Sequence, residues 1–409
     1  MADETKTDWK QTLKDASASA LSVVSKKWVA YLLTLLFTTL VTALLTWLGV
    51  KAPPLPRPEP PDEPFIVIEG SEEDASPPTP LLIGAAPAAP IHRTVHTGWR
   101  RDPEAVRAVK AALPFKAFAD TPAGQDDAPL PDHAYLWQAY RKLKGHNPPG
   151  KDQGQVGSCV SFGTNSAIER TMAVDIAVRG RPNEFKFIAE EVTYAGSRVE
   201  VGRNKISGDG SVNAWAAQFV QRYGVVSREK HGRHDLTGYD ERRCREWGFR
   251  GVPDDLEPLA RDHPVEDFTQ VRAWEEAKKA LASGHGIAIA SNQGFGQRRD
   301  SRGVCKPLGN WNHSMCLDGY HTDEQGREYG HIDNSWGDDF FAGPVGWGDP
   351  GPSGFWAEAR VVDRMLRQGD SWAFSAVKGF PTRRIKLDWF VERRPEQRRA
   401  LEAPFALAP

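Results

Sequence analysis

One long uncharged run dominates the hydropathy pattern near the N-terminus. No charged residue occurs from Trp28 to Val50. A helix of that length rises about 1.5 Å per residue and would cross a bilayer core of ~30 Å. Nothing that resembles a small-residue cleavage site follows the run, and residues 51–90 are dense in proline. The pattern therefore predicts a retained signal-anchor, a transmembrane helix over 28–50, followed by an extended spacer.

The basic residues on either side of this run predict its orientation. Five lysines precede it, whereas only Lys51 and Arg57 follow it closely. Basic residues favour the cytoplasmic side of a membrane. We therefore expect a cytoplasmic tail over 1–27, and an extracytoplasmic location for the chain from Lys51 onward.

Apolar periodicity returns after a linker that spans residues 51–129 and carries one helix candidate over 103–113. The pattern then predicts helices in the first half of the remaining chain and short strands in the second half. The helices are expected over 159–178, 186–200, 211–224 and 273–283, and the strands over 286–291, 315–320, 329–333 and 371–374. This order indicates an α+β domain over 130–380, with two lobes and a cleft between them.

Charge and cysteine content narrow the classes of function. The chain has 409 residues and a formal net charge of -2, so no global charge favours nucleic acid as a partner. The basic C-terminal tail, 381–409, is either a solvated tail or a site for an acidic partner. The four cysteines are too few for a disulfide scaffold, and either one Cys244–Cys305 bridge or four free thiols fits the count.

The chemistry of the chain centres on Cys159. It follows a glycine-rich turn and begins a predicted helix, where the macrodipole and unpaired N–H groups favour a thiolate. Gln153 lies six residues earlier and carries an amide that can donate to an oxyanion. His313 begins one predicted strand and Asn334 follows the next, so adjacent antiparallel strands would bring them side by side.

These segments together resemble the papain family of cysteine peptidases. The resemblance covers about 130–380 and rests on the order of the Cys159, His313 and Asn334 blocks, with Asn334-Ser335-Trp336-Gly337 matching outright. The residues around Tyr194 and Gly208 look more like the bacterial branch. The resemblance implies a helical lobe packed beside a β-barrel-like lobe. We expect no cofactor, and no residue pattern in the sequence approaches a metal-ligand set.

The resemblance also implies a role for each site residue. Cys159 would be the nucleophile, a thiolate beside imidazolium His313, which Asn334 orients, while Gln153 donates to the oxyanion. Trp336 would shield the His313–Asn334 bond from water. The residues implied to bind the substrate are Gly208, Asp209, Gly210 and Trp336.

Several positions depart from the family pattern. Val156 and Gly208 occupy positions where many members have a disulfide pair, so this bridge is expected to be absent. Val160 replaces the usual tryptophan after the nucleophile. Ser211 replaces a second glycine, and an insertion after Asn334 enlarges a neighbouring loop.

The leading hypothesis is a membrane-anchored cysteine peptidase that hydrolyses peptide bonds in peptide or protein substrates. It would act through a thioester acyl-enzyme on Cys159. Two alternatives stay open. One is a weak or inactive module that binds extended peptides, and the other is an amidase that acts on cell-wall peptides.

Overall fold

A computed structural model describes residues 96–179, 184–261, 265–376, 378 and 380, together with Leu33 and Thr34. The chain divides into two compact units, Met1–Pro87 and Ala88–Pro409, and the second unit carries every element named below. The predicted cytoplasmic tail, the rest of the 28–50 segment, the linker up to residue 95 and the basic tail from 381 lie outside the described residues. Within the described part, no helix has the length and apolar character needed to cross a membrane.

The helical half of the prediction is confirmed, and further helices lie between the predicted ones. The prediction over 186–200 splits at Gly196, after which the chain forms a π-helical turn, Ser197–Val201. The α-helices are α3 (Pro103–Ala111), α4 (Trp137–Lys144), α5 (Cys159–Arg179), α6 (Glu190–Gly196), α7 (Asn213–Tyr223), α8 (Glu241–Arg250), α9 (Glu257–Arg261), α10 (Trp274–Ala282) and α11 (Ala359–Leu366).

The strands form one antiparallel sheet in the order β4-β9-β5-β6-β7-β8, with β1 paired to β6, and a separate β2–β3 hairpin. The strands are β1 (His133–Tyr135), β2 (Lys230–His231), β3 (His234–Asp235), β4 (Asp267–Gln270), β5 (Ile287–Arg299), β6 (Cys305–Thr322), β7 (Glu328–Asp333), β8 (Phe355–Glu358) and β9 (Trp372–Ser375). β5 and β6 are far longer than predicted, and their pairing shifts register three times. Such irregularities bend strands, so the sheet curls.

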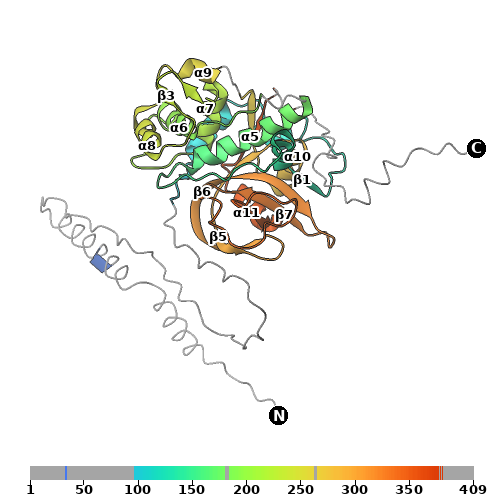
Figure 1. Cartoon of the computed structure of the whole chain (residues 1–409). Coiled ribbons are helices and arrows are strands. Elements are labelled where there is room, and N and C mark those ends of the chain that lie inside the picture. The colour runs from blue at the N-terminus through green and yellow to red at the C-terminus, as the bar shows by residue number, and fades with distance from the viewer. Residues whose placement is uncertain are drawn as a thin grey trace, which may run out of the picture. The chain divides into compact units, whose positions relative to one another are not determined.

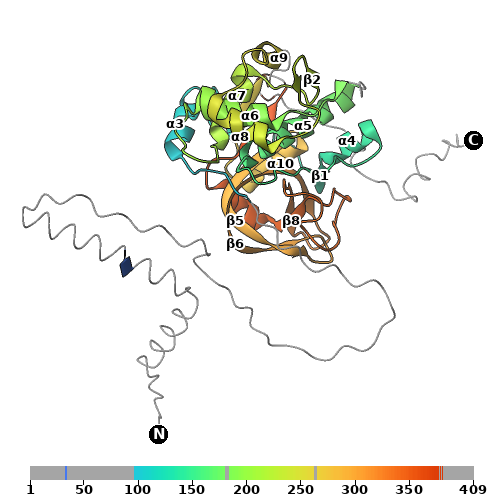
Figure 2. The ribbon, with the colours of Figure 1, turned by 60° about the vertical axis from the view of Figure 1, so that its left-hand side comes forward.

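Helix α5 lies between the helical group and the strands, as two views of the ribbon show (Figures 1 and 2). Glycines permit this close packing. A Cβ on Gly163 would lie 2.7 Å from the Ser314 Oγ, and one on Gly286 would lie 2.3 Å from the Ala167 carbonyl oxygen. The helix that begins with Cys159 is therefore pressed against the strand that carries His313. The predicted α+β arrangement is confirmed, with a curled sheet where a β-barrel-like lobe was expected.

Residues 96–129, which the sequence assigned to the linker, pack against this body. Val106 and Val109 of α3 join the core of the helical lobe. Phe118 is fully buried and meets the Phe380 ring edge-on, with 5.7 Å between ring centroids. The folded region thus includes a segment that runs from His96 to the predicted start of the domain.

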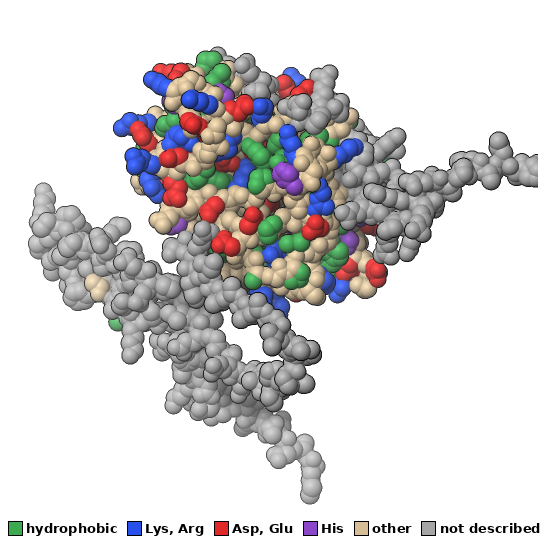
Figure 3. Space-filling view, in the orientation of Figure 1, with side chains coloured by type: hydrophobic (Ala, Val, Ile, Leu, Met, Phe, Trp, Pro, Cys, Tyr) green, Lys and Arg blue, Asp and Glu red, His purple; other side chains and the backbone are tan. Residues whose placement is uncertain are grey.

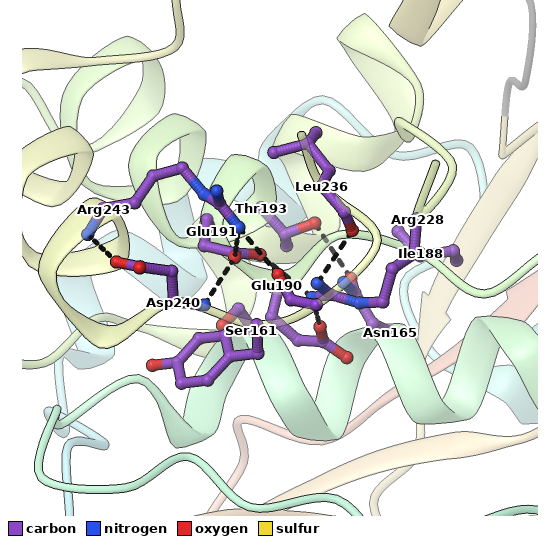
Figure 4. A network of polar contacts seen from close by, with 12 residues as sticks. Ser161, Asn165, Ile188, Glu190, Glu191, Thr193, Arg228, Leu236, Asp240 and Arg243 are labelled. Carbon is purple, nitrogen blue, oxygen red and sulfur yellow. Dashed lines mark hydrogen bonds and ion pairs between the residues drawn. The ribbon is translucent and has the colours of Figure 1, made fainter. Parts of the chain in front are cut away.

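Buried ion pairs hold the segment before the nucleophile. Lys151 contacts Glu169 of α5 and Glu190 of α6, each with an N–O distance of 2.7 Å. Glu190 and its neighbour Glu191 also pair with Arg228, within the polar network of Figure 4. On the surface, by contrast, basic and acidic side chains are interspersed over the face drawn in Figure 3.

A second buried network ties α5 to the strands. The Arg170 guanidinium donates to Asp318 of β6 at 2.8 Å and to Asp333 of β7 at 2.7 Å. Asp318 also lies 2.6 Å from the Nδ1 of His331. Since Asp333 directly precedes Asn334, this network fixes the end of β7 relative to α5.

Candidate active site

Cys159 is the first residue of α5 and is completely buried. Burial raises the pKa of the Cys159 thiol to about 11, although backbone N–H groups of Ser314, Gly98, Trp99 and Val160 point toward the sulfur and favour the thiolate. The sequence led us to expect a thiolate here from the helix N-terminus. In this structure, loss of water outweighs that effect.

His313, on β6, is also completely buried. Its Nε2 lies 2.7 Å from the Asn334 Oδ1, and the Trp336 ring stacks on the imidazole at a centroid distance of 4.2 Å. Burial lowers the pKa of His313 to about 4, against the opposing effect of the Asn334 hydrogen bond. The pair therefore differs from the expected thiolate and imidazolium, because both groups are neutral at pH 7.

The second ring nitrogen of His313, Nδ1, is buried. Nδ1 has no hydrogen-bond partner among the described residues. The next residue, Ser314, directs its backbone N–H toward the Cys159 sulfur. The geometry thus brings Cys159, His313 and Asn334, from three separate parts of the sequence, into one site.

Gln153 lies beside these residues and is fully buried. Its Oε1 accepts a hydrogen bond from the Ser335 hydroxyl at 2.7 Å, which sets the orientation of the side-chain amide. The Nε2 donates to the Val156 carbonyl at 2.8 Å and to the His96 carbonyl at 2.9 Å. The group expected to donate to an oxyanion is therefore bonded to a main-chain carbonyl of the N-terminal segment.

Residues 96–100, here called the covering segment, lie across the nucleophile. Its main chain pairs in parallel with Ser211: the Arg100 N–H donates to the Ser211 carbonyl, and the Ser211 N–H donates to the Gly98 carbonyl, each at 2.8 Å. The Trp99 N–H donates to the Asn312 carbonyl at 3.0 Å. The segment therefore occupies the position that an extended ligand would take beside Cys159.

The expected substrate-binding glycines lie at the edge of this contact. The Asp209 carbonyl accepts hydrogen bonds from the Arg100 guanidinium. A Cβ on Gly210 would lie 2.6 Å from the Gly98 carbonyl oxygen, whereas one on Gly208 would meet no other group within 4 Å. The main-chain pairing itself falls on Ser211 and not on the predicted Gly208, Asp209 or Gly210.

Two further side chains of the site were missed from the sequence. Trp99 packs in one cluster with Cys159, Val160, Ala216 and Ala290. Its indole N–H donates to the Asp370 carboxylate at 2.8 Å. These partners are 271 positions apart, and no motif links them, so only the fold reveals the contact.

All four cysteines, Cys159, Cys244, Cys305 and Cys316, are free and buried, as the four-thiol interpretation predicted. Val156 packs against Tyr194 and Cys244 in a small apolar cluster. No group of three or more His, Cys, Asp or Glu side chains among the described residues is arranged to hold a metal ion.

This chain is similar to two proteins that are named as cysteine peptidases. Cysteine proteinase 1 of Entamoeba histolytica is 26% identical over 218 residues, which is 51% of this chain and 60% of that protein. Cysteine endopeptidase RepA of Oryza sativa subsp. japonica is 25% identical over 235 residues, 56% of this chain and 52% of that protein. The match thus spans between half and two thirds of each of these relatives.

Solved structures of cysteine proteases are similar at low identity. Xylellain from Xylella fastidiosa is 16% identical and covers 69% of this chain and 92% of its own, with a TM-score of 0.42. Procathepsin L 3 of the Tenebrio molitor larval midgut is 17% identical, with a TM-score of 0.41; the match covers 66% of this chain and 79% of that chain.

The family model for papain family cysteine proteases matches residues 138–348. This range is more than half of the chain, and it contains Cys159, His313 and Asn334. The chain therefore belongs to the papain family of cysteine proteases.

Proposed function

We propose that this protein is a cysteine endopeptidase that hydrolyses peptide bonds through a thioester on Cys159. One observation carries the proposal. His313 is held by Asn334 through Nε2, while its Nδ1 has no partner among the described residues and its neighbour Ser314 contacts the nucleophile. A nucleophile, a base and an orienting group in this arrangement suit acyl transfer.

The proposed mechanism uses these groups in turn. His313 Nδ1 takes the thiol proton, and the Cys159 sulfur attacks the carbonyl carbon of the scissile bond. Gln153 Nε2 donates a hydrogen bond to the resulting oxyanion. This donor lowers the activation barrier by roughly 3 kcal/mol. The C–N bond breaks as His313 returns the proton to the leaving amine. Water, deprotonated by His313, then attacks the thioester; the C–S bond breaks, the acid is released, and His313 returns the proton to the Cys159 sulfur.

We further propose that the protein as described is latent. The covering segment supplies the carbonyl bonded to Gln153 and packs Trp99 against Cys159, and both Cys159 and His313 are buried and neutral at pH 7. A substrate can reach the sulfur only after residues 96–100 move away. The same occupied cleft is also what a module that only binds peptides would present.

Hydrolysis of a fluorogenic peptide mixture distinguishes a latent protease from a module that only binds peptides. The Gly98→Ala variant, which should displace the covering segment, is compared with the Gly98→Ala/Cys159→Ala variant. We expect hydrolysis by the first and none by the second. Peptide binding without any hydrolysis dependent on Cys159 would favour the binding module and contradict the protease.

Membrane anchoring through residues 28–50, with the protease domain outside the cytoplasm, remains our proposal from the uncharged run and the flanking lysines. Protease added to intact spheroplasts should remove the part that carries Cys159. Full protection, with cleavage after detergent lysis, would contradict the proposed orientation.

A further inference from the structure

The side-chain pocket beside Cys159 is occupied by Trp99. The indole is almost fully buried, and its neighbours Val160, Ala216 and Ala290 form walls of small apolar side chains. Because these side chains are small, they leave room for a large planar ring such as the indole of Trp99. The pocket therefore already contains a ligand, one that belongs to the covering segment.

The floor of this pocket is a buried carboxylate. Asp370 is 2% exposed and accepts four hydrogen bonds, two on each oxygen. Oδ1 accepts from the Ala214 N–H at 2.9 Å and from the Trp372 indole at 2.8 Å. Oδ2 accepts from the Asn213 N–H at 3.0 Å and from the Trp99 indole at 2.8 Å.

Three of these donors are fixed parts of the fold, and the fourth is not. The Asn213 and Ala214 amides begin α7, and Trp372 begins β9. Trp99 belongs to the segment that must leave before a substrate enters. Its departure leaves one acceptor position of Asp370 Oδ2 open toward the pocket.

The main chain determines which residue of an incoming peptide meets this position. Ser211 pairs through both its N–H and its carbonyl with the residues on either side of Trp99. An extended peptide that pairs with Ser211 therefore directs one side chain into the pocket. Asp370 is in position to discriminate among the side chains that enter.

We propose that Asp370 is a specificity-determining residue that selects substrates with a tryptophan side chain in this pocket, by accepting the indole N–H at Oδ2. The inference rests on the proposed protease function. The proposal predicts that the pocket prefers an indole in the substrate, the same group that Trp99 of the covering segment places there.

The number of donors favours indole over the alternatives. An indole brings one N–H donor, which matches the single acceptor position that Trp99 vacates, whereas an ammonium brings three donors and a guanidinium five. Leucine or phenylalanine would fill the space but leave a buried acceptor without a partner, at a cost of about 1–3 kcal/mol. Although burial raises the pKa of Asp370 to about 6, the carboxyl is ionised at pH 7 and accepts at both oxygens.

The test uses the full-length Gly98→Ala/Trp99→Ala protein, in which Gly98→Ala displaces the covering segment and Trp99→Ala removes its side chain from the pocket. Peptides that differ at one residue carry tryptophan, 3-benzothienylalanine, phenylalanine or arginine, and each position is varied in turn. Benzothienylalanine keeps the shape of the ring and replaces the N–H with sulfur. We expect kcat/KM for the tryptophan peptide to exceed that for the benzothienylalanine peptide by about 5–150-fold at one position.

Asp370→Asn, added to Gly98→Ala/Trp99→Ala, should shrink this ratio, because an amide cannot accept all four hydrogen bonds. Asp255→Asn is the matched control for the loss of one negative charge. Asp255 is half exposed and pairs with Arg233 and His234 on the β2–β3 hairpin, so the ratio should not change.

The outcomes separate this inference from the proposed function. If no peptide is cut in a manner that depends on Cys159, the protease proposal fails. The affinities of the same two peptides for the Gly98→Ala/Trp99→Ala/Cys159→Ala protein, measured by calorimetry, then test the pocket alone. Equal values for tryptophan and benzothienylalanine, a ratio unchanged by Asp370→Asn, or a preference for arginine would each overturn the assignment.

Discussion

Gly98 offers the sharpest test of the covering segment. A Cβ on this glycine would lie 1.8 Å from the Gly157 carbonyl oxygen and 2.4 Å from its carbonyl carbon. Both atoms belong to the backbone of the turn that precedes Cys159, so they cannot rotate away as a side chain would. Gly98→Ala therefore cannot occupy the closed position without moving the segment or the turn.

The size of the effect follows from this clash. Forcing one extra methyl group into a packed site costs typically about 1–3 kcal/mol. That cost acts on the closed state, since the clash exists only while Gly98 lies against Gly157. An equilibrium shifted by this amount changes about 5–150-fold, and we expect the population of the open state to rise by that factor.

Alkylation of Cys159 by iodoacetamide, followed by peptide mapping, measures this population. Cys244, Cys305 and Cys316 serve as internal references, because they are buried and burial raises the pKa of each. Gly98→Ala should raise the alkylation rate of Cys159 by about 5–150-fold and leave the other three rates unchanged.

Gly238→Ala is the matched control. A Cβ at this position would meet nothing within 4 Å, so the same chemical change carries no clash. The reasoning is refuted if Gly98→Ala leaves Cys159 as slow to react as in the parent, or if Gly238→Ala accelerates it equally. Acceleration of all four cysteines together would indicate general unfolding, and would also refute a local opening.

Three further results are expected. In the Gly98→Ala protein, Asn334→Ala should lower kcat about 10–100-fold, since a hydrogen bond to a charged imidazolium contributes about 1.5–3 kcal/mol; an unchanged kcat would contradict the orienting role. In the parent, burial holds the pKa of Cys159 at about 11 and that of His313 at about 4, so both are neutral at pH 7. The thiolate fraction then grows as the pH rises, and the ultraviolet thiolate absorbance that Cys159→Ala removes should climb steadily from about pH 7 to about pH 10, whereas a plateau there would argue against a buried neutral thiol. Arg170→Met, which leaves two buried carboxylates without their cation, should cost about 3–5 kcal/mol in urea unfolding, and a loss below about 1 kcal/mol would rule out the bridging role of this network.

The residues of the site were readable from the sequence because each lies in a short local pattern. A turn rich in glycine, followed by Cys159 and a helix, is visible in a few consecutive residues, and so is a strand that begins at His313. The strands themselves were underestimated. The part of β6 before His313 carries polar and exposed residues, and periodicity of apolar residues cannot detect such a strand.

Contacts between residues that lie far apart in the sequence could not be predicted from it. Helix α8 was missed because arginine and glutamate dominate it, and only Cys244, Trp247 and Gly248 are buried. The covering segment was assigned to a linker, since its few residues have no repeating pattern, although Trp99 finds a partner at Asp370. Such contacts depend on the fold as a whole and leave no local signal.

In the proposed latent state, the covering segment excludes water and substrate and does not distort the catalytic groups. The His313–Asn334 hydrogen bond, the stacking of Trp336 on the imidazole and the Ser335–Gln153 hydrogen bond are all formed without any atom of residues 96–100. The segment's own N–H groups even favour the Cys159 thiolate, so the high pKa of this thiol comes from burial. Displacement of residues 96–100 alone should therefore restore ionisation and activity, with no rearrangement of β6 or β7. Activation would then need only an event that removes a few main-chain hydrogen bonds and one tryptophan from the cleft.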